Sequence, residues 1–166
     1  MPFDPTRIGP DVDAYFAETE GQFTDIKPGT EKRVVWADAP GTLTDCVGVY
    51  VHGFAATSED IRPAPDRIAA ELCANIVFTR LAGHGRHPDA MAEATQEAWI
   101  DDVTEALAAA REVGDRIIVI STSTGGTIVT ALSQNKTVMA QVAGFIFVAP
   151  NFGINNPLAR LLKWPL

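Results

Sequence analysis

The hydrophobic residues of the chain gather in short continuous runs that close in turn residues. Four runs share this design: CVGVYVHG (46–53), ANIVFTRLAG (74–83), DRIIVIST (115–122) and VAGFIFVAP (142–150). Runs of this kind are typical of strands that are buried on both faces of a parallel sheet. The segment KRVVWAD (32–38) precedes them and predicts an edge strand.

Between these runs the apolar positions follow a helical spacing. Ile68, Ala69 and Leu72 share one face of a short helix after Pro65. A longer amphipathic helix is predicted by residues spaced four, three, four and three apart: Trp99, Val103, Ala106, Ala110 and Val113. A third helix is predicted over 125–132. Alternating strands and helices indicate an α/β fold, with a mostly parallel sheet flanked by helices and right-handed crossovers.

Length and composition narrow the function classes. A chain of 166 residues is predicted to form a single domain over 1–166. Its net charge of −8 argues against nucleic acid as a partner, because phosphate binding needs a basic surface. No apolar run is long enough for a membrane span. With two cysteines and no apolar leader at the start, we expect a cytoplasmic location.

The stretch VISTSTGGTIV (119–129) predicts a strand, a tight turn and the start of a helix, with Ser123 in the turn. A serine at this place is exposed at the carboxyl end of the sheet, where ligands bind in open α/β sheets. Ser121 and Gly125, two residues to either side, are small, as a sharp turn requires. The G-x-S-x-G pattern of serine hydrolases is thus present with serine in place of its first glycine. A Ser/Thr-rich helix cap without catalytic function is the alternative.

The stretch YVHGFAATSED (50–60) ends a strand in His52-Gly53 and continues into a loop. A loop at this position supplies one donor of an oxyanion hole, the backbone N–H of Phe54, and Thr124 N–H supplies the other. Such donors, fixed before the substrate arrives, typically contribute about 2.7–4 kcal/mol each to transition-state stabilisation. The alternative is an ordinary turn at the end of a strand.

Taken together, four stretches resemble the α/β-hydrolase family, in particular its carboxylesterase and monoacylglycerol-lipase-like branch: VYVHGFAAT, RLAGHGRH, WIDDVTEAL and ISTSTGGTI. They cover about residues 46–150 in the family's order. The resemblance implies that Ser123 is the nucleophile toward carboxylic esters, through an acyl-enzyme. It further implies that His52, Gly53 and His84 line the cleft, and it implies no metal and no cofactor.

The chain departs from the family after the serine, where the family places its acid and its histidine. No Asp, Glu or His follows Thr124. We therefore expect the N-terminal part of the fold, truncated after about the sixth strand, with 154–166 as the start of a cap region. The acid and the base would then come from a complementing C-terminal polypeptide or from a second chain.

Three alternatives stay open at this stage. His84 is a candidate base within the chain, provided that it reaches Ser123. His84, His87 and Asp89 form a weak metal-ligand pattern without a second cluster. A non-catalytic half-domain would expose the edge of the strand at 142–150 and the apolar helix at 158–164, and would self-associate into a homo-oligomer.

Overall fold

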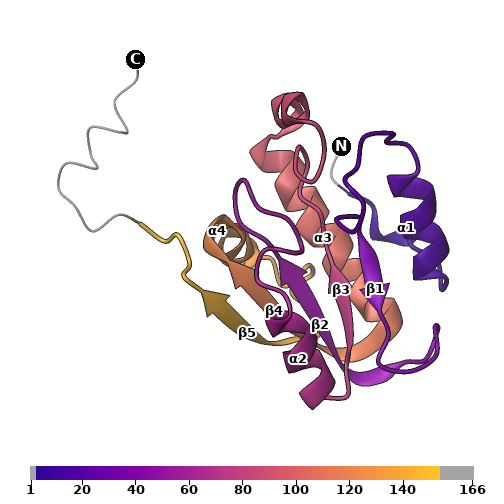
Figure 1. Cartoon of the computed structure of the whole chain (residues 1–166). Helices are drawn as coiled ribbons and strands as arrows, with labels where there is room; N and C mark the ends of the chain where they lie inside the picture. Colours follow the sequence, from indigo (N-terminus) through magenta and orange to yellow (C-terminus); the bar gives the residue numbers. More distant parts are fainter. Residues whose placement is uncertain (1–2, 154–166) are drawn as a thin grey trace.

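A five-stranded sheet, parallel except at one edge, forms the centre of the protein (Figure 1). The structure, a computed structural model, describes residues 3–153. The strands are β1 (Arg33–Val35), β2 (Thr44–Val51), β3 (Asn75–Phe78), β4 (Gly114–Thr122) and β5 (Val142–Val148). Their order across the sheet is β1-β3-β2-β4-β5, and only β1 runs antiparallel to its neighbour. The predicted fold class, with β1 as an edge strand, is confirmed.

Four helices flank this sheet: α1 (Val12–Glu20), α2 (Ala64–Glu71), α3 (Gln96–Val113) and α4 (Ser123–Leu132). Two short 3-10 helices, η1 (Pro5–Arg7) and η2 (Pro88–Glu93), lie in the connections. The three helices expected from the sequence appear as α2, α3 and α4. Thr95 is the N-cap of α3, and its hydroxyl accepts a hydrogen bond from Ala98 N–H.

The helices bury their apolar residues on both faces of the sheet. On one face α1, α3 and α4 pack over the inward-facing side chains of β2 and β4 in one continuous core. On the opposite face α2 covers a smaller core built around Tyr50, Phe78 and Ile120. Figure 1 shows α2 on the side of the sheet away from α3.

α1 was not predicted, although its signal is present in the sequence. Val12, Tyr15 and Phe16 have helical spacing and are buried. The Asp11 side chain accepts a hydrogen bond from Ala14 N–H and caps the helix.

The prediction for Leu72 was wrong, because this side chain is 49% exposed. Leu72 is the C-cap residue of α2, and its N–H donates to the carbonyls of Ile68 and Ala69, so it keeps the helical register but lies at the exposed end of the helix. Leu72 instead borders an open hollow of about 520 Å³ together with Ile118 and Phe145.

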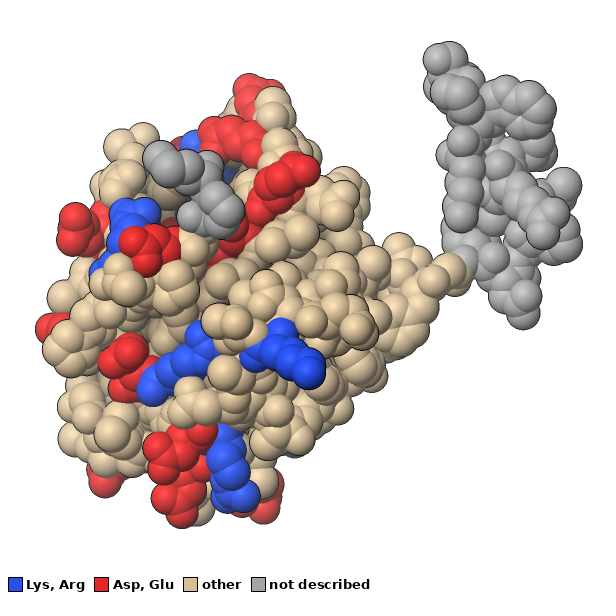
Figure 2. Space-filling view, turned by 180° about the vertical axis from the view of Figure 1, so that it is seen from behind, with Lys and Arg blue, Asp and Glu red and all other residues tan. Residues whose placement is uncertain are grey.

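The far edge of the sheet is apolar and uncovered by the described residues. Phe145, Ile146, Phe147 and Val148 of β5 are all exposed. Figure 2 shows the flank formed by this part of the molecule without charge, whereas acidic and basic side chains gather over the rest of that face. The cap region and the terminal helix expected over 154–166 lie outside the described residues. Within 3–153, no helix has both the length and the apolar character that crossing a bilayer would require.

Candidate active site

Ser123 lies where β4 passes into α4, and its backbone is in the left-handed region. β4 ends at Thr122, and Ser123 is the first residue of the helix, with φ of 45°. A residue other than glycine adopts this conformation at a cost of about 1–2 kcal/mol. Such strain is found where the surrounding structure holds a functional side chain in place. The Ser123 side chain is half-buried, and no hydrogen bond joins its hydroxyl to another residue of 3–153.

The turn brings α4 very close to β2. A Cβ on Gly125 would lie 2.5 Å from the carbonyl oxygen of Val51 and 2.6 Å from that of His52. Only glycine fits such a contact, which explains the small residue that the pattern demands here. Ser121, at the position of the usual first glycine, is fully buried, and its hydroxyl has no partner among the described residues.

The N-terminus of α4 makes no hydrogen bond to a capping side chain. Its N-cap residue is Thr122, whose hydroxyl lies 3.2 Å from the Tyr50 hydroxyl instead. The N–H groups of a first helical turn have no partners within the helix. Thr124 N–H is one of them, and it lies at the positive end of the helix dipole.

The loop after β2 lies directly against Ser123. A Cβ on Gly53 would be 3.1 Å from Ser123 Cβ. Phe54 follows, with its side chain 58% exposed and its ring 6.2 Å from that of Trp99. Phe54 N–H donates to no other group within the described part of the chain. The structure therefore places Gly53, the residue before Phe54, against Ser123; an oxyanion hole formed by Phe54 N–H and Thr124 N–H stays a prediction.

His52 is buried beneath this loop. Its Nε2 accepts a hydrogen bond from Leu81 N–H at 3.0 Å, so its Nδ1 carries the proton and donates to Gly53 O at 2.8 Å. Burial lowers the pKa of His52 to about 4, and the nearby His84 and Arg80 act in the same direction. His52 is thus a neutral residue that fixes the end of β2.

His84 is also buried, with its ring centroid 5.0 Å from that of His52. Its Nε2 accepts a hydrogen bond from Ala55 N–H at 3.1 Å, and its Nδ1 donates to Ala82 O at 3.1 Å. Neither ring nitrogen of either histidine is left for Ser123. Both rings lie under the loop, whereas the prediction placed them on the wall of a cleft.

His87 is far more exposed than His84. It caps η2 by accepting a hydrogen bond from Asp89 N–H, and its Nδ1 lies 3.2 Å from an Asp89 carboxylate oxygen. Across residues 3–153, no three His, Cys, Asp or Glu side chains converge in a way that could hold a metal ion.

Three buried ion pairs, two of them made by Lys32, were not predicted. Lys32 Nζ lies 2.8 Å from Asp102 Oδ1 and also contacts Glu105, while Arg80 pairs with Glu20 at 2.8 Å. Burial by itself would lower the pKa of Lys32, but the two carboxylates raise it above its ordinary value. The partners are far apart in the sequence, so no local pattern indicates them.

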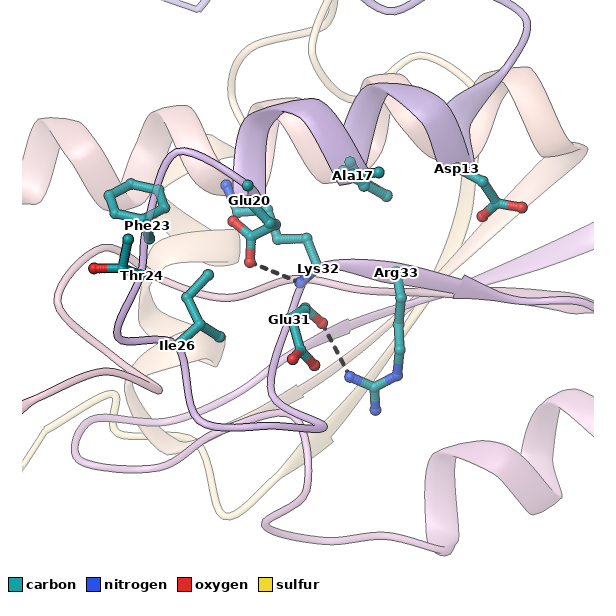
Figure 3. Close-up of a pocket in the computed structure, with 11 residues that line it drawn as sticks. Asp13, Ala17, Glu20, Phe23, Thr24, Ile26, Glu31, Lys32 and Arg33 are labelled. Carbon is teal, nitrogen blue, oxygen red and sulfur yellow. Dashed lines mark hydrogen bonds between the residues drawn. The ribbon is translucent and has the colours of Figure 1, made fainter.

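A separate hollow of about 430 Å³ lies between α1 and the segment 21–33 (Figure 3). Its charged side chains already have partners within the protein. Lys32 N–H donates to Glu20 Oε2, and Arg33 donates to the Glu31 carbonyl, each at 3.0 Å. None of the predicted site residues lines this hollow.

Comparison with known proteins decides the family. The model of the "Alpha/beta hydrolase family" matches residues 49–166, which include the loop after β2 and the β4–α4 turn. The chain belongs to the alpha/beta hydrolase family. This alpha/beta hydrolase is 32% identical over 90 residues to a thermostable monoacylglycerol lipase from Bacillus sp. (strain H-257). The predicted resemblance to the carboxylesterase and monoacylglycerol-lipase-like branch is confirmed.

Solved structures agree on the fold. A structure from work on LipS and LipT, two metagenome-derived lipolytic enzymes, matches with a TM-score of 0.67 and 23% identity, covering 84% of this chain and 53% of that one. A protein of unknown function from Staphylococcus aureus subsp. aureus Mu50 matches with a TM-score of 0.52 and 17% identity, covering 81% and 47%. The aligned part of the Bacillus lipase is 54% of this hydrolase and 36% of that protein. The chain therefore spans about half or less of the length of these relatives.

Proposed function

We propose that this chain carries the nucleophile and the oxyanion hole of a serine hydrolase that acts on carboxylic esters. The observation that carries the proposal is Ser123 itself, held at a φ of 45° in the strand-to-helix turn and facing Gly53. A strained backbone at this position presents the hydroxyl at the carboxyl edge of the sheet.

The reaction follows from this geometry. Ser123 Oγ attacks the ester carbonyl and passes its proton to a base, and the carbonyl oxygen becomes an oxyanion that Phe54 N–H and Thr124 N–H bind. The alcohol leaves and an acyl-enzyme remains, which water then hydrolyses. The proposed reaction uses no metal and no cofactor.

The base and its acid are proposed to come from polypeptide other than residues 3–153, either more of the same protein or a second chain. His52 and His84 use both ring nitrogens in other hydrogen bonds. His87 pairs with Asp89. A serine without a base is a weak nucleophile at neutral pH.

The substrate class is proposed from the relatives. One of them is a monoacylglycerol lipase and another is described as lipolytic. We propose a small ester substrate of the acylglycerol kind. The exposed Phe54 ring would offer it an apolar contact beside Ser123.

The test is the turnover of a short p-nitrophenyl ester by the 166-residue chain and by its Ser123→Ala variant. A matched control is Ser133→Ala, which removes an exposed hydroxyl at the other end of α4. Turnover that is lost in Ser123→Ala and kept in Ser133→Ala supports the nucleophile and shows that a base is available to the chain. Turnover above the rate of the ester in buffer that is equal in all three proteins would contradict an ester hydrolase at Ser123 in this chain. Turnover no faster than in buffer is the result expected of a chain whose base lies in other polypeptide.

The exposed edge of β5 favours a second candidate, a half-domain that functions through association. An unpaired apolar strand edge can pair with another chain. The four consecutive exposed side chains of β5 supply an apolar contact beside it. Association would also be the route by which a second chain brings a base to Ser123.

A further inference from the structure

The peptide between Phe54 and Ala55 is held by a side chain from the segment that follows β3. Ala55 has a φ of 56°, again in the left-handed region although it is not glycine. Its side chain and that of Phe54 are exposed, so packing by these side chains does little to fix the loop. Within the loop, Ala56 N–H donates to Gly53 O at 3.4 Å, a long hydrogen bond, so a further contact is needed to hold the strained residue.

That contact is the hydrogen bond from Ala55 N–H to Nε2 of His84, at 3.1 Å. The acceptor belongs to a ring that is only 2% exposed and lies among His52, Phe54 and Trp99. A buried acceptor makes this bond stronger than a bond to an exposed group, because water competes less for the N–H.

The ring of His84 is itself held in one orientation. Its Nδ1 donates to Ala82 O, and this carbonyl also accepts Trp99 Nε1–H at 3.0 Å. Ala82 N–H donates in turn to Oδ2 of Asp102, whose other oxygen is paired with Lys32. The backbone of Ala82 is therefore held at both its N–H and its carbonyl, and the carbonyl sets the tautomer of His84.

We propose that His84 is a positioning residue for the oxyanion hole, which places Phe54 N–H by binding the next residue, Ala55. The Lys32–Asp102 pair holds Ala82 N–H, the Ala82 carbonyl holds the His84 ring, and the His84 ring holds Ala55 in the loop. This role rests on the proposed function, because Phe54 N–H is an oxyanion donor only in an ester hydrolase. It also explains why a histidine lies under the loop without a nitrogen for Ser123.

Two polar variants separate this role from simple packing. In His84→Asn the short side chain keeps a donor near Ala82 O but does not reach Ala55. In His84→Gln the longer side chain brings an amide oxygen to the place of Nε2. His87→Asn is the matched control, since His87 is an exposed histidine whose side chain contacts Asp89 and makes no hydrogen bond to Ala55.

The first readout is amide hydrogen exchange at Ala55 in the 166-residue chain, measured by NMR with Val49 in β2 as a monitor of overall stability. Loss of the acceptor should speed exchange at Ala55 by about tenfold in His84→Asn, with Val49 unchanged. Exchange in His84→Gln and His87→Asn should stay near that of the wild-type chain. Wild-type exchange at Ala55 in His84→Asn, or equal acceleration in the Asn and Gln variants, would overturn the proposal.

The second readout is kinetic. Where the wild-type chain shows turnover that depends on Ser123, His84→Asn should lower kcat by about 10- to 100-fold with KM nearly unchanged. His84→Gln should keep most of the wild-type kcat. A raised KM with an unchanged kcat would overturn the positioning role. Turnover above the rate in buffer that does not depend on Ser123 would contradict the proposed function, and the exchange at Ala55 would still decide whether His84 holds the loop.

Discussion

His52 makes the stability of the fold depend on pH. Its pKa is about 4 in the folded protein, against an ordinary value of 6.5, because it is buried. Between these two values the unfolded chain binds a proton that the folded chain does not bind. The stabilisation is therefore complete above about pH 6.5 and is lost as the pH falls toward 4, by roughly 3 kcal/mol in total.

Urea unfolding at about pH 7 and about pH 4.5 measures this loss. His52→Gln is the control, since its amide oxygen can accept Leu81 N–H but does not titrate. Its stability should change less over this range than that of the wild-type chain. Equal losses in the two proteins would show that His52 is not the group responsible.

At Gly125, the addition of a single carbon should lower the stability of the fold. In Gly125→Ala the new Cβ would meet two backbone carbonyl oxygens of β2 at 2.5 and 2.6 Å. Because backbone in the centre of a sheet cannot move aside, we expect a destabilisation of about 1–3 kcal/mol, seen as a lower Tm. Gly126→Ala is the matched control, since the nearest atoms to its Cβ would be side-chain carbons of Pro150 and Phe147, at 3.1 and 3.3 Å. A Tm that falls equally in both variants would contradict this account.

At the scale of the elements, the Lys32 ion pairs tie the start of β1 to α3. Lys32→Met would leave the carboxylates of Asp102 and Glu105 buried without their cation. Removing one partner of a buried pair costs about 3–5 kcal/mol. Arg62→Met is the control, because Arg62 pairs with Glu59 and Asp66 at the surface, where a pair contributes about 1 kcal/mol or less. Chemical denaturation measures the free energy of unfolding of both variants. Similar losses of stability would argue against the buried ion pairs as the contact that joins β1 to α3.

The sequence predicts those elements whose signal is continuous and local. β2, β4 and α3 are found because their apolar residues follow one period over many positions. Leu72 is exposed because it lies at the C-cap of α2, and spacing alone does not show whether another element covers that end. The Lys32–Asp102 contact joins residues 70 positions apart, so only the folded chain reveals it.

The same division holds at the site. Ser123, Gly125 and the loop at Phe54 are indicated by motifs within a few residues. The places of His52 and His84 depend instead on which backbone groups face each ring nitrogen. The partners of each ring nitrogen are residues that are close only in the folded chain, so residue type and spacing do not predict them.

At the scale of the whole molecule, the apolar edge formed by β5 should govern association. Replacing an exposed edge residue by lysine blocks pairing between strand edges. We therefore expect Ile146→Lys to shift the protein toward monomer, as measured by sedimentation velocity at several concentrations. Leu43→Lys is the control, because Leu43 is an exposed apolar side chain outside β5. An unchanged distribution in Ile146→Lys would place any self-association on another surface.

The left-handed backbone at Ser123 also bears on how such a protein can change over generations. Glycine adopts this conformation without the penalty that serine carries, about 1–2 kcal/mol. Selection for stability alone would therefore favour glycine at position 123. Serine persists there only while its hydroxyl contributes more to fitness than the stability it costs. A descendant released from its chemistry would be expected to lose this hydroxyl early, and to become more stable by doing so.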